Sequence, residues 1–366
     1  MAHASLKLCF VGWADHVHLE RWAGHFAKLG HRVSVISFSD RGTYPQGVQQ
    51  YPLRLKGRNA RWVVLELRYL LWKIRPDIVH AHWAHFAESV SRAWPGPLAV
   101  TVWGSEVYRR ENFSSAQWRG LTEGLRAASV ITCDSEDLAA LVRSEFQLEP
   151  GRVMVIQWGV DTSLFSPSIG SNRLLHELGA VGRTVVFSPR NFTSVYNLEA
   201  VVEAFAGIRR KVQTAMLLMK RHGGDASYSA KIEERIGSLG LTDAVRIMET
   251  IPYEQMPDLY RISAVTVSVP LSDATPMALL EAMACGSVPV VSDLPSLREW
   301  IKDGWNGFLV DPKDVSRLSD CVAQLIAKPA LASDFARRNL EIVEARASQA
   351  THMGRMEATY RKLATI

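Results

Sequence analysis

Short apolar runs of strand length alternate along the chain with segments in which apolar residues recur at helical spacing. Strands joined by helical crossovers pair in parallel, and nearly continuous apolar strands indicate a sheet that is covered on both faces. The first half of the chain is therefore expected to form one α/β domain. Its strands are predicted over residues 6–12, 32–38, 77–81, 98–103, 129–133 and 153–156, and its helices over residues 17–29, 61–74, 117–127 and 136–145.

The same alternation restarts after a polar stretch near residues 162–182, which is the expected linker. Strands are predicted over residues 184–188, 215–219, 244–248, 264–269, 288–292 and 307–310, and helices over 197–210, 228–238, 276–284, 314–327 and 330–364. The pattern predicts an N-terminal domain over 1–165 and a second α/β domain over 166–345. A C-terminal helix over 346–366 could pack back on the N-terminal domain.

The composition is that of an ordinary globular protein. The chain has 366 residues, a length that suggests two domains. Of these residues 47% are apolar and 22% charged, and the mean hydropathy is -0.02, so each domain is expected to bury an ample hydrophobic core. Neither a signal-peptide pattern nor an apolar run of roughly 18 residues is visible, and a cytoplasmic location is expected. The cysteines form no close pair, so neither a zinc site nor a disulfide framework is predicted.

The net charge of +5 is unevenly distributed. Residues 1–160 contain 19 Lys and Arg against 14 Asp and Glu, whereas residues 161–366 contain 23 of each kind. The basic segment 54–75 also carries Trp62, Tyr69 and Trp72. It could lie on the cytoplasmic face of an anionic membrane, although packing of its apolar stripe on the first sheet is the favoured interpretation. No nucleic-acid-binding motif is visible, and no nucleic acid partner is expected.

Ligands of open parallel sheets bind beyond the carboxyl ends of the strands, so two such domains facing each other would leave a binding cleft between them. Most of the chemical information lies in residues 268–289. Thr275 is predicted as N-cap and Pro276 as the first residue of a helix, so the backbone N–H groups of Met277 and Ala278 would face an anion such as a diphosphate. Glu281, further along this helix, could accept hydrogen bonds from a ribose diol. The alternative is a capped helix with an exposed acidic residue.

The stretch 273–286, DATPMALLEAMACG, resembles the signature of the retaining glycosyltransferases of family 4 (glycosyl transferases group 1), which have the GT-B fold. Asp273 and Glu281 stand at the family's spacing for two acidic residues of the donor site, with Asp in place of the usual first Glu. Further similarities occur at residues 77–83, 100–106, 159–167 and 304–312. The resemblance implies two Rossmann-like domains facing across a cleft.

By this resemblance, Glu281 would bind the ribose of a nucleotide sugar, and Asp273 would touch the transferred sugar. Backbone groups at Thr275, Pro276, Met277 and Ala278 would hold the donor. Arg190 matches a family arginine that would neutralise the leaving diphosphate, because its planar guanidinium can pair with two phosphate oxygens.

Two positions depart from the family pattern. The lysine that usually follows the arginine is absent, and Lys220 or Arg221 could supply the missing charge; the alternative is that both lie in a solvated loop. In the first domain, Trp103 replaces a histidine that contacts the sugar, so it could stack on a sugar but cannot act as a base. The other candidates for contact with acceptor or sugar are at strand ends, namely Gly12, His16, His18, His82 and His85.

The function expected from these residues is transfer of a sugar from a UDP-, GDP- or ADP-linked donor to an acceptor hydroxyl. The acceptor could be a glycan, a lipid-linked molecule or a small molecule. Retention of configuration is implied by the family alone. No Asp-x-Asp motif is present, so neither a metal nor another cofactor is expected. A nucleotide-sugar epimerase and an inactive nucleotide-sugar-binding protein remain as alternatives. A dinucleotide oxidoreductase is disfavoured because residues 12–17 do not continue as G-x-G-x-x-G.

Overall fold

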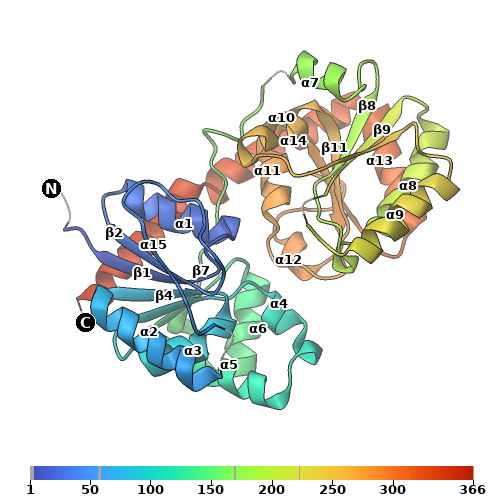
Figure 1. The fold of residues 1–366 in the computed structure, drawn as a ribbon. Coiled ribbons are helices and arrows are strands. Elements are labelled where there is room, and N and C mark those ends of the chain that lie inside the picture. Colours follow the sequence, from blue (N-terminus) through green and yellow to red (C-terminus); the bar gives the residue numbers. More distant parts are fainter. Residues whose placement is uncertain (1–3, 57–58, 169, 222, 366) are drawn as a thin grey trace. The chain divides into compact units, whose positions relative to one another are not determined.

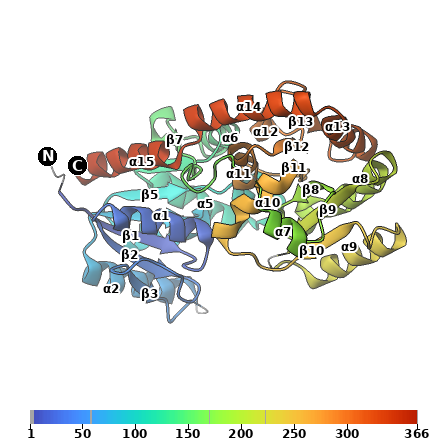
Figure 2. The same cartoon turned by 90° about the horizontal axis from the view of Figure 1, so that it is seen from above.

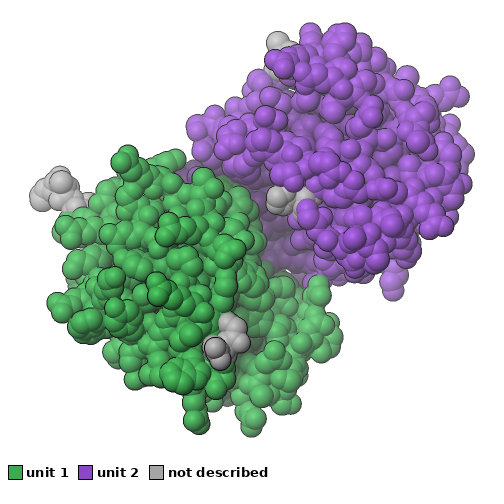
Figure 3. Space-filling model, viewed as in Figure 1, with its two compact units in different colours: residues 1–158, 351–366 green, residues 159–350 purple. Residues whose placement is uncertain are grey.

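The computed structural model describes residues 4–56, 59–168, 170–221 and 223–365. The chain forms two compact units, one made of Met1–Trp158 with Thr351–Ile366 and the other of Gly159–Ala350 (Figure 3). The sequence placed the division after residue 165.

Unit 1 is built on a seven-stranded parallel sheet with the strand order β3-β2-β1-β4-β5-β6-β7 (Figure 1). Its strands are β1 Lys7–Gly12, β2 Arg32–Ser37, β3 Gln49–Pro52, β4 Ile78–His82, β5 Leu98–Thr101, β6 Val130–Cys133 and β7 Val153–Val155. The edge strand β3 was not predicted, because its sequence QQYP contains no apolar run. The reversal of order between β1 and β4 places the ends of these two strands at the topological switch point, where open sheets bind ligands.

Helices lie on both sides of this sheet (Figures 1 and 2). They are α1 Val17–Lys28, α2 Ala60–Ile74, α3 Ala87–Ala93, α4 Ser105–Tyr108, α5 Ser115–Ala127, α6 Glu136–Phe146 and α15 Gln349–Ala364, with the short 3-10 helices η1 Ala84–Phe86, η2 Arg110–Asn112 and η3 Pro150–Arg152. From α15, the Tyr360 hydroxyl accepts the indole N–H of Trp22 at 3.1 Å and lies 2.5 Å from Nδ1 of His80. The end of the chain is therefore part of the core of unit 1.

Unit 2 contains a six-stranded parallel sheet with the order β10-β9-β8-β11-β12-β13. Its strands are β8 Thr184–Ser188, β9 Ala215–Lys220, β10 Val245–Met248, β11 Ser263–Ser268, β12 Val288–Ser292 and β13 Phe308–Val310. Its helices are α7 Asn172–Glu177, α8 Leu198–Lys211, α9 Ala226–Ser238, α10 Met256–Ile262, α11 Met277–Cys285, α12 Pro295–Arg298, α13 Val315–Ala327 and α14 Pro329–Arg346, with η4 Ser194–Tyr196 and η5 Tyr253–Gln255. Both sheets are thus open and parallel, as the sequence predicts for Rossmann-like units.

The helical pattern over residues 330–364 is not one continuous helix, because the chain breaks between α14 and α15, near residue 346 where a separate C-terminal helix is expected to begin. At the break, the N–H of Val160 donates to the carbonyl of Ala347 at 2.7 Å, and the N–H of Gln349 donates to the carbonyl of Val160 at 2.9 Å. Gly159 has φ +69, and a Cβ there would lie 2.4 Å from the Cα of Gln349. The tertiary crossing of these two segments therefore interrupts the helix, and no glycine or proline in the sequence marks the place.

Candidate functional site

The first positively charged group of the site is Arg190, two residues beyond β8. The side chain is buried, and its Nη2 donates to Oδ2 of Asp273 at 2.7 Å. The guanidinium also lies 3.9 Å from the centroid of the Tyr196 ring. Burial alone would lower the pKa of Arg190, but Asp273, Tyr196 and Tyr260 outweigh it and raise the pKa above the usual value. Arg190 is therefore a permanent cation at the end of the central strand.

Asp273 lies in the loop between β11 and α11. The Ser296 hydroxyl donates to the carbonyl oxygen of Asp273 at 2.8 Å, and the N–H of Leu271 donates to the carbonyl of Val195 at 2.8 Å. Burial raises the pKa of the Asp273 carboxyl, and the charge of Arg190 opposes this rise. The loop is thus fixed at two points, and these hydrogen bonds hold the carboxylate against the guanidinium.

The start of α11 differs from the prediction by one residue. Pro276 is the N-cap, with φ -72 and ψ 123, and the helix begins at Met277. The prediction of Thr275 as N-cap is wrong, because its hydroxyl accepts the indole N–H of Trp300 at 3.3 Å and no side-chain cap bond is made. The first hydrogen bond of this turn runs from the N–H of Leu279 to the carbonyl of Pro276. Helix geometry leaves the N–H groups of Met277 and Ala278 without an acceptor within the helix.

Glu281 is buried in α11, not exposed as the alternative interpretation required. Its two carboxylate oxygens accept hydrogen bonds from the hydroxyls of Tyr253 and Tyr260, each at 3.1 Å. The sequence analysis did not identify these tyrosines. Their spacing of seven residues, two helical turns, is a signal that could have placed them on one side of η5 and α10.

Lys220 is the last residue of β9, half-buried beside the same groups. Burial lowers the pKa of Lys220, Glu281 opposes the shift, and Arg190 adds to it. Lys220 is therefore within electrostatic reach of both residues and does not lie in a solvated loop. Arg221 is already engaged, because its guanidinium forms ion pairs with Glu233 and Glu249.

Two buried hydroxyls lie at the ends of adjacent strands β8 and β11. Oγ of Ser188 and Oγ of Ser268 have no hydrogen-bond partner within the described part of the chain. Together with Arg190, Lys220, Asp273, Glu281 and the first turn of α11, they make the carboxyl edge of this sheet polar, with two cations beside two carboxylates. Such an edge can bind a polar anion.

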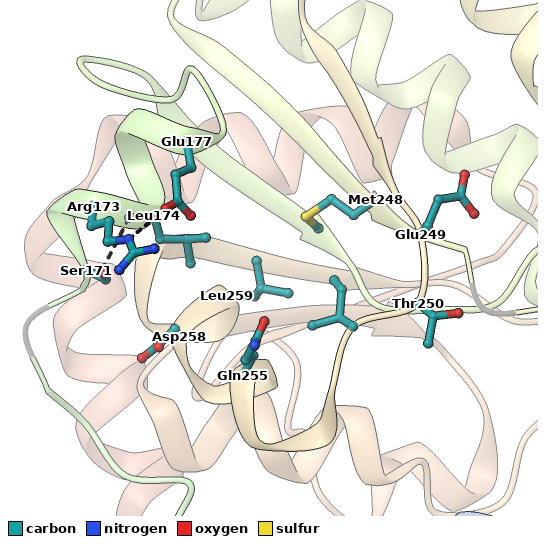
Figure 4. A pocket seen from close by; sticks show the side chains of 11 residues that line it. Ser171, Arg173, Leu174, Glu177, Met248, Glu249, Thr250, Gln255, Asp258 and Leu259 are labelled. Atoms are coloured by element: carbon teal, nitrogen blue, oxygen red, sulfur yellow. Dashed lines mark hydrogen bonds and ion pairs between the residues drawn. The ribbon is translucent and has the colours of Figure 1, made fainter.

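A separate pocket of about 500 Å³ lies between α7, the end of β10 and α10 (Figure 4). Leu174, Leu259 and Met248 line its interior. The three carboxylates at its rim are already paired with arginines, in the pairs Arg173–Glu177, Arg221–Glu249 and Arg261–Asp258. None of the predicted site residues lines this pocket, and its neutralised charges do not favour a diphosphate. The pocket adjoins the donor residues through η5, since Gln255 lines it and Tyr253 contacts Glu281.

In unit 1, His16 and Trp103 lie together, with ring centroids 4.4 Å apart. His16 caps α1, its Nδ1 accepting the N–H of His18 at 3.3 Å. The indole N–H of Trp103 is buried without an acceptor among the described residues. His82 is fully buried beneath them, and neither ring nitrogen has a partner in that same part of the chain. Gly12 is explained by packing, because a Cβ there would lie 3.1 Å from the carbonyl oxygen of His82.

The histidines at this edge are neutral at ordinary pH. Burial lowers the pKa of His16 to about 4, of His80 to about 3 and of His85 to about 4. Burial also lowers the pKa of His82 well below its usual value. Neutral imidazoles can donate or accept a hydrogen bond to a hydroxyl, but they add no positive charge to unit 1.

A pocket of about 460 Å³ opens beside these residues and is lined by aromatic and polar side chains. The ring centroids of Trp83 and His85 are 3.8 Å apart, and those of His85 and Phe113 are 4.8 Å apart. Arg109 is one of the polar residues that line the pocket. Trp83 has φ 78, a conformation that costs energy for a residue with a side chain and that concentrates at binding sites. The pocket therefore combines flat apolar rings with hydrogen-bond donors.

Within the residues that the structure describes, no helix is long and apolar enough to cross a membrane. In the same ranges, no group of three or more His, Cys, Asp or Glu side chains is arranged to hold a metal ion.

Two family descriptions match the chain. "Glycosyltransferase Family 4" matches residues 16–164, and "Glycosyl transferases group 1" matches residues 176–341. Curated relatives include a D-inositol 3-phosphate glycosyltransferase of Nocardiopsis dassonvillei, 26% identical over 69% of this chain and 63% of the relative. Another, from Streptosporangium roseum, is 27% identical over 70% of this chain and 62% of the relative. The chain thus matches less than two thirds of the length of these relatives.

Solved structures show the same fold across nearly the whole chain. HepE of Anabaena in complex with UDP and glucose has a TM-score of 0.82 and 17% identity, covering 98% of this chain and 100% of that one. The sucrose-phosphate synthase of Thermosynechococcus elongatus has a TM-score of 0.83 and 17% identity, covering 98% and 99%. The two matched family regions cover most of the sequence; the first contains β2 to β7 of one open parallel sheet, and the second contains β8 to β13 of the other. The chain belongs to the glycosyltransferases of family 4, also described as glycosyl transferases group 1, and has their GT-B fold of two Rossmann-like domains.

Proposed function

We propose that this protein transfers a sugar from a nucleoside diphosphate sugar to an acceptor hydroxyl, with retention of configuration and without a metal. One observation carries the proposal: the ends of β8 and β9 and the start of α11 bring two cations, Arg190 and Lys220, to the same edge as the buried carboxylate of Glu281. Diphosphate and ribose are the two donor groups that require this combination.

The charges suit cleavage of the anomeric bond. When the bond between the sugar carbon and the diphosphate oxygen breaks, negative charge grows on the diphosphate and positive charge on the sugar ring. Arg190 is held in place by Asp273 and Tyr196, so its remaining N–H groups are oriented before the reaction begins. A preorganised cation of this kind stabilises the leaving group with little reorganisation. Lys220 and the N–H groups of Met277 and Ala278 would also stabilise the negative charge on the diphosphate.

Glu281 would orient the nucleoside. In the absence of ligand its oxygens accept from Tyr253 and Tyr260, so the carboxylate position is fixed. A carboxylate in this position can accept hydrogen bonds from two adjacent hydroxyls, as a ribose diol presents them. Asp273 would lie next to the transferred sugar, where its negative charge favours the developing positive charge on the ring.

The acceptor would bind in the aromatic pocket of unit 1. Trp83, His85 and Phe113 present flat faces on which a sugar or cyclitol ring can stack, and Arg109 offers a positive charge to an acidic or phosphorylated acceptor. No covalent nucleophile is identified, so the acceptor oxygen would attack from the face that the diphosphate leaves. The names of the curated relatives make inositol phosphates a first choice for an acceptor panel.

Ligand-dependent melting tests the donor class. UDP-, GDP- and ADP-sugars are added to separate samples, with the free nucleosides as controls that lack the diphosphate. A ligand at roughly 100 times its Kd stabilises the folded state by about 2.7 kcal/mol, a clear shift of the melting temperature. A shift by the nucleoside equal to that by the nucleotide sugar would contradict the diphosphate site.

Product analysis separates the alternatives. Incubation with donor alone would yield an isomerised sugar if the protein is an epimerase. Binding without transfer or hydrolysis across a broad acceptor panel would indicate an inactive binding protein. Transfer with the anomeric configuration of the donor, undiminished after exhaustive chelation of metals, is the result that we expect.

A further inference from the structure

The helix α2 in unit 1 is apolar on two opposite sides. Its inner stripe, Val63, Leu67 and Leu71, is buried in unit 1, as the favoured interpretation of the sequence required. Its outer side carries four large apolar side chains that are each between 51% and 66% exposed: Trp62, Leu65, Tyr69 and Trp72. Among the described residues nine large apolar side chains are exposed, and these four are on one helix.

The four outer residues form one continuous stripe. Their spacing of three, four and three residues places them on a single face over almost the full length of α2, roughly 22 Å. The rings of Tyr69 and Trp72 stack with centroids 6.3 Å apart. In both ribbon views, α2 lies at the outside of the sheet of unit 1 (Figures 1 and 2). We call Trp62, Leu65, Tyr69 and Trp72 the outer stripe.

Basic residues are frequent in the sequence around the outer stripe, although Lys56 is paired with Asp40. The segment 54–75 contains seven Lys and Arg residues and one acidic residue, Glu66, a net charge of +6. The whole chain has a net charge of +5, so all other residues together carry -1. Glu66 is turned to the backbone, where it accepts the N–H groups of Arg54 and Leu55 at 2.9 and 2.8 Å.

The basic side chains border the outer stripe instead of crossing it. At helical spacing, Arg61 and Arg68 fall along one border and Lys73 along the other, and all three are exposed. A small pocket of about 330 Å³ lies at the arginine border, with Val64 and Leu65 in its wall and Arg61, Arg68 and Arg92 around it. Arg92 is paired with Glu88 and Glu123, so Arg61 and Arg68 are the guanidinium groups that would meet a lipid phosphate at this apolar recess.

We propose that α2 is the surface by which this protein binds an anionic lipid bilayer. The outer stripe would enter the boundary between headgroups and acyl chains, where tryptophan and tyrosine side chains are favoured, while the flanking cations pair with anionic headgroups. A second copy of the chain fits less well, because a two-fold contact through this face would bring the exposed Arg61, Arg68 and Lys73 of both copies together.

Flotation of the full chain with lipid vesicles tests the proposal. Vesicles of phosphatidylcholine alone are compared with vesicles that contain phosphatidylglycerol, at about 0.1 M and about 1 M salt, since the Debye length falls between them from about 10 to about 3 Å. We expect flotation with the anionic vesicles at low salt, and a loss of at least about tenfold at high salt or with neutral vesicles.

The matched variants are the double substitution Trp62→Ala/Trp72→Ala and the single substitution Trp305→Ala, which removes an exposed tryptophan from unit 2. Circular dichroism verifies that each folds. We expect the double variant to lose at least about tenfold in vesicle binding and Trp305→Ala to bind like the wild type. Full binding by the double variant, equal loss in the control, or no flotation of the wild type would overturn the proposal. Self-association that the double variant abolishes, without flotation, would identify the face as a contact between copies and would also overturn it.

Discussion

Removal of Arg190 is expected to damage both the fold of unit 2 and the reaction, and the structure allows the two effects to be separated. The guanidinium is 8% exposed, and its partner Asp273 accepts its hydrogen bond at 2.7 Å. In Arg190→Ala the carboxylate would be left buried without its counter-charge. In the double variant Arg190→Ala/Asp273→Asn the negative charge of residue 273 is removed together with its partner, so no unpaired charge is buried.

The magnitudes follow from burial. Breaking one side of a buried ion pair costs about 3–5 kcal/mol, and the lower value applies here because Asp273 retains 18% side-chain exposure. The double variant should recover about 1–3 kcal/mol of this loss. Arg190→Ala should lose roughly 10²–10³-fold in kcat, as expected when one preorganised charge on a leaving group is deleted. The double variant should lose at least as much, because it also lacks the carboxylate charge of Asp273 beside the transferred sugar.

The assay combines urea unfolding with sugar transfer measured under conditions where each variant is fully folded. Arg337→Ala is the matched control, because Arg337 pairs with Asp334 on exposed α14. That change should cost at most about 1 kcal/mol and leave kcat unchanged. If the double variant regained both stability and turnover, Arg190 would have only a structural role. Near-normal turnover in folded Arg190→Ala would refute its action on the diphosphate.

Three further predictions concern the crossing, a buried histidine and the donor carboxylate. Gly159→Ala should destabilise the protein by about 3 kcal/mol or more in urea unfolding, because Gly159 has a positive φ and a Cβ there would lie 2.4 Å from the Cα of Gln349. In the control Gly237→Ala the new Cβ meets nothing within 4 Å, so this variant should be neutral or stabilising. Equal losses of stability in the two variants would contradict the argument. Burial lowers the pKa of His80 to about 3. Below a pH of about 6.5, His80 therefore binds a proton in the unfolded chain but stays neutral in the native state. The stability of unit 1 should therefore be complete above that pH and fall by up to about 1.4 kcal/mol for each pH unit of acidification, and a His80→Asn variant should show a shallower slope in melts between pH 7 and 5. Glu281→Gln should weaken UDP binding at least about tenfold in calorimetry while deoxyribose analogues bind both forms alike, and an unchanged affinity would remove the ribose role.

The positions of most strands, their parallel pairing and most of the donor edge could be predicted from the sequence. Buried parallel strands are continuous apolar runs, and the segment 268–289 has a specific pattern. Arg190, Asp273 and Glu281 do lie at the carboxyl edge of one sheet. The polar edge strand β3 could not be predicted, since its pairing with β2 leaves no periodic signal. A separate C-terminal helix from residue 346 is expected from the sequence, but the hydrogen bonds of Val160 that interrupt the chain there are not.

Rules based on neighbouring residues in the sequence also failed to predict the N-cap of α11 and the contacts of Arg190 and Arg221, because tertiary contacts determine them. Thr275 has the preferred chemistry of an N-cap, but Trp300, 25 residues away, takes its hydroxyl. Tyr196 stands in the stretch where the family lysine is missing, and only the structure shows its ring against Arg190. The choice between Lys220 and Arg221 likewise required the positions of Glu233 and Glu249, which engage the arginine.

The place of α15 has a consequence for biosynthesis. Tyr360 completes the hydrogen bonds of His80 across a sequence separation of 280 residues. At translation rates of about 5–20 residues per second, roughly 10–40 s pass between synthesis of β7, the last strand of the first sheet, and synthesis of Tyr360. A fragment that ends at residue 158 would lack α15 and would expose the surface of unit 1 that this helix covers. Isolating unit 1 for study therefore calls for a fusion in which a short linker joins residue 158 to residues 351–366.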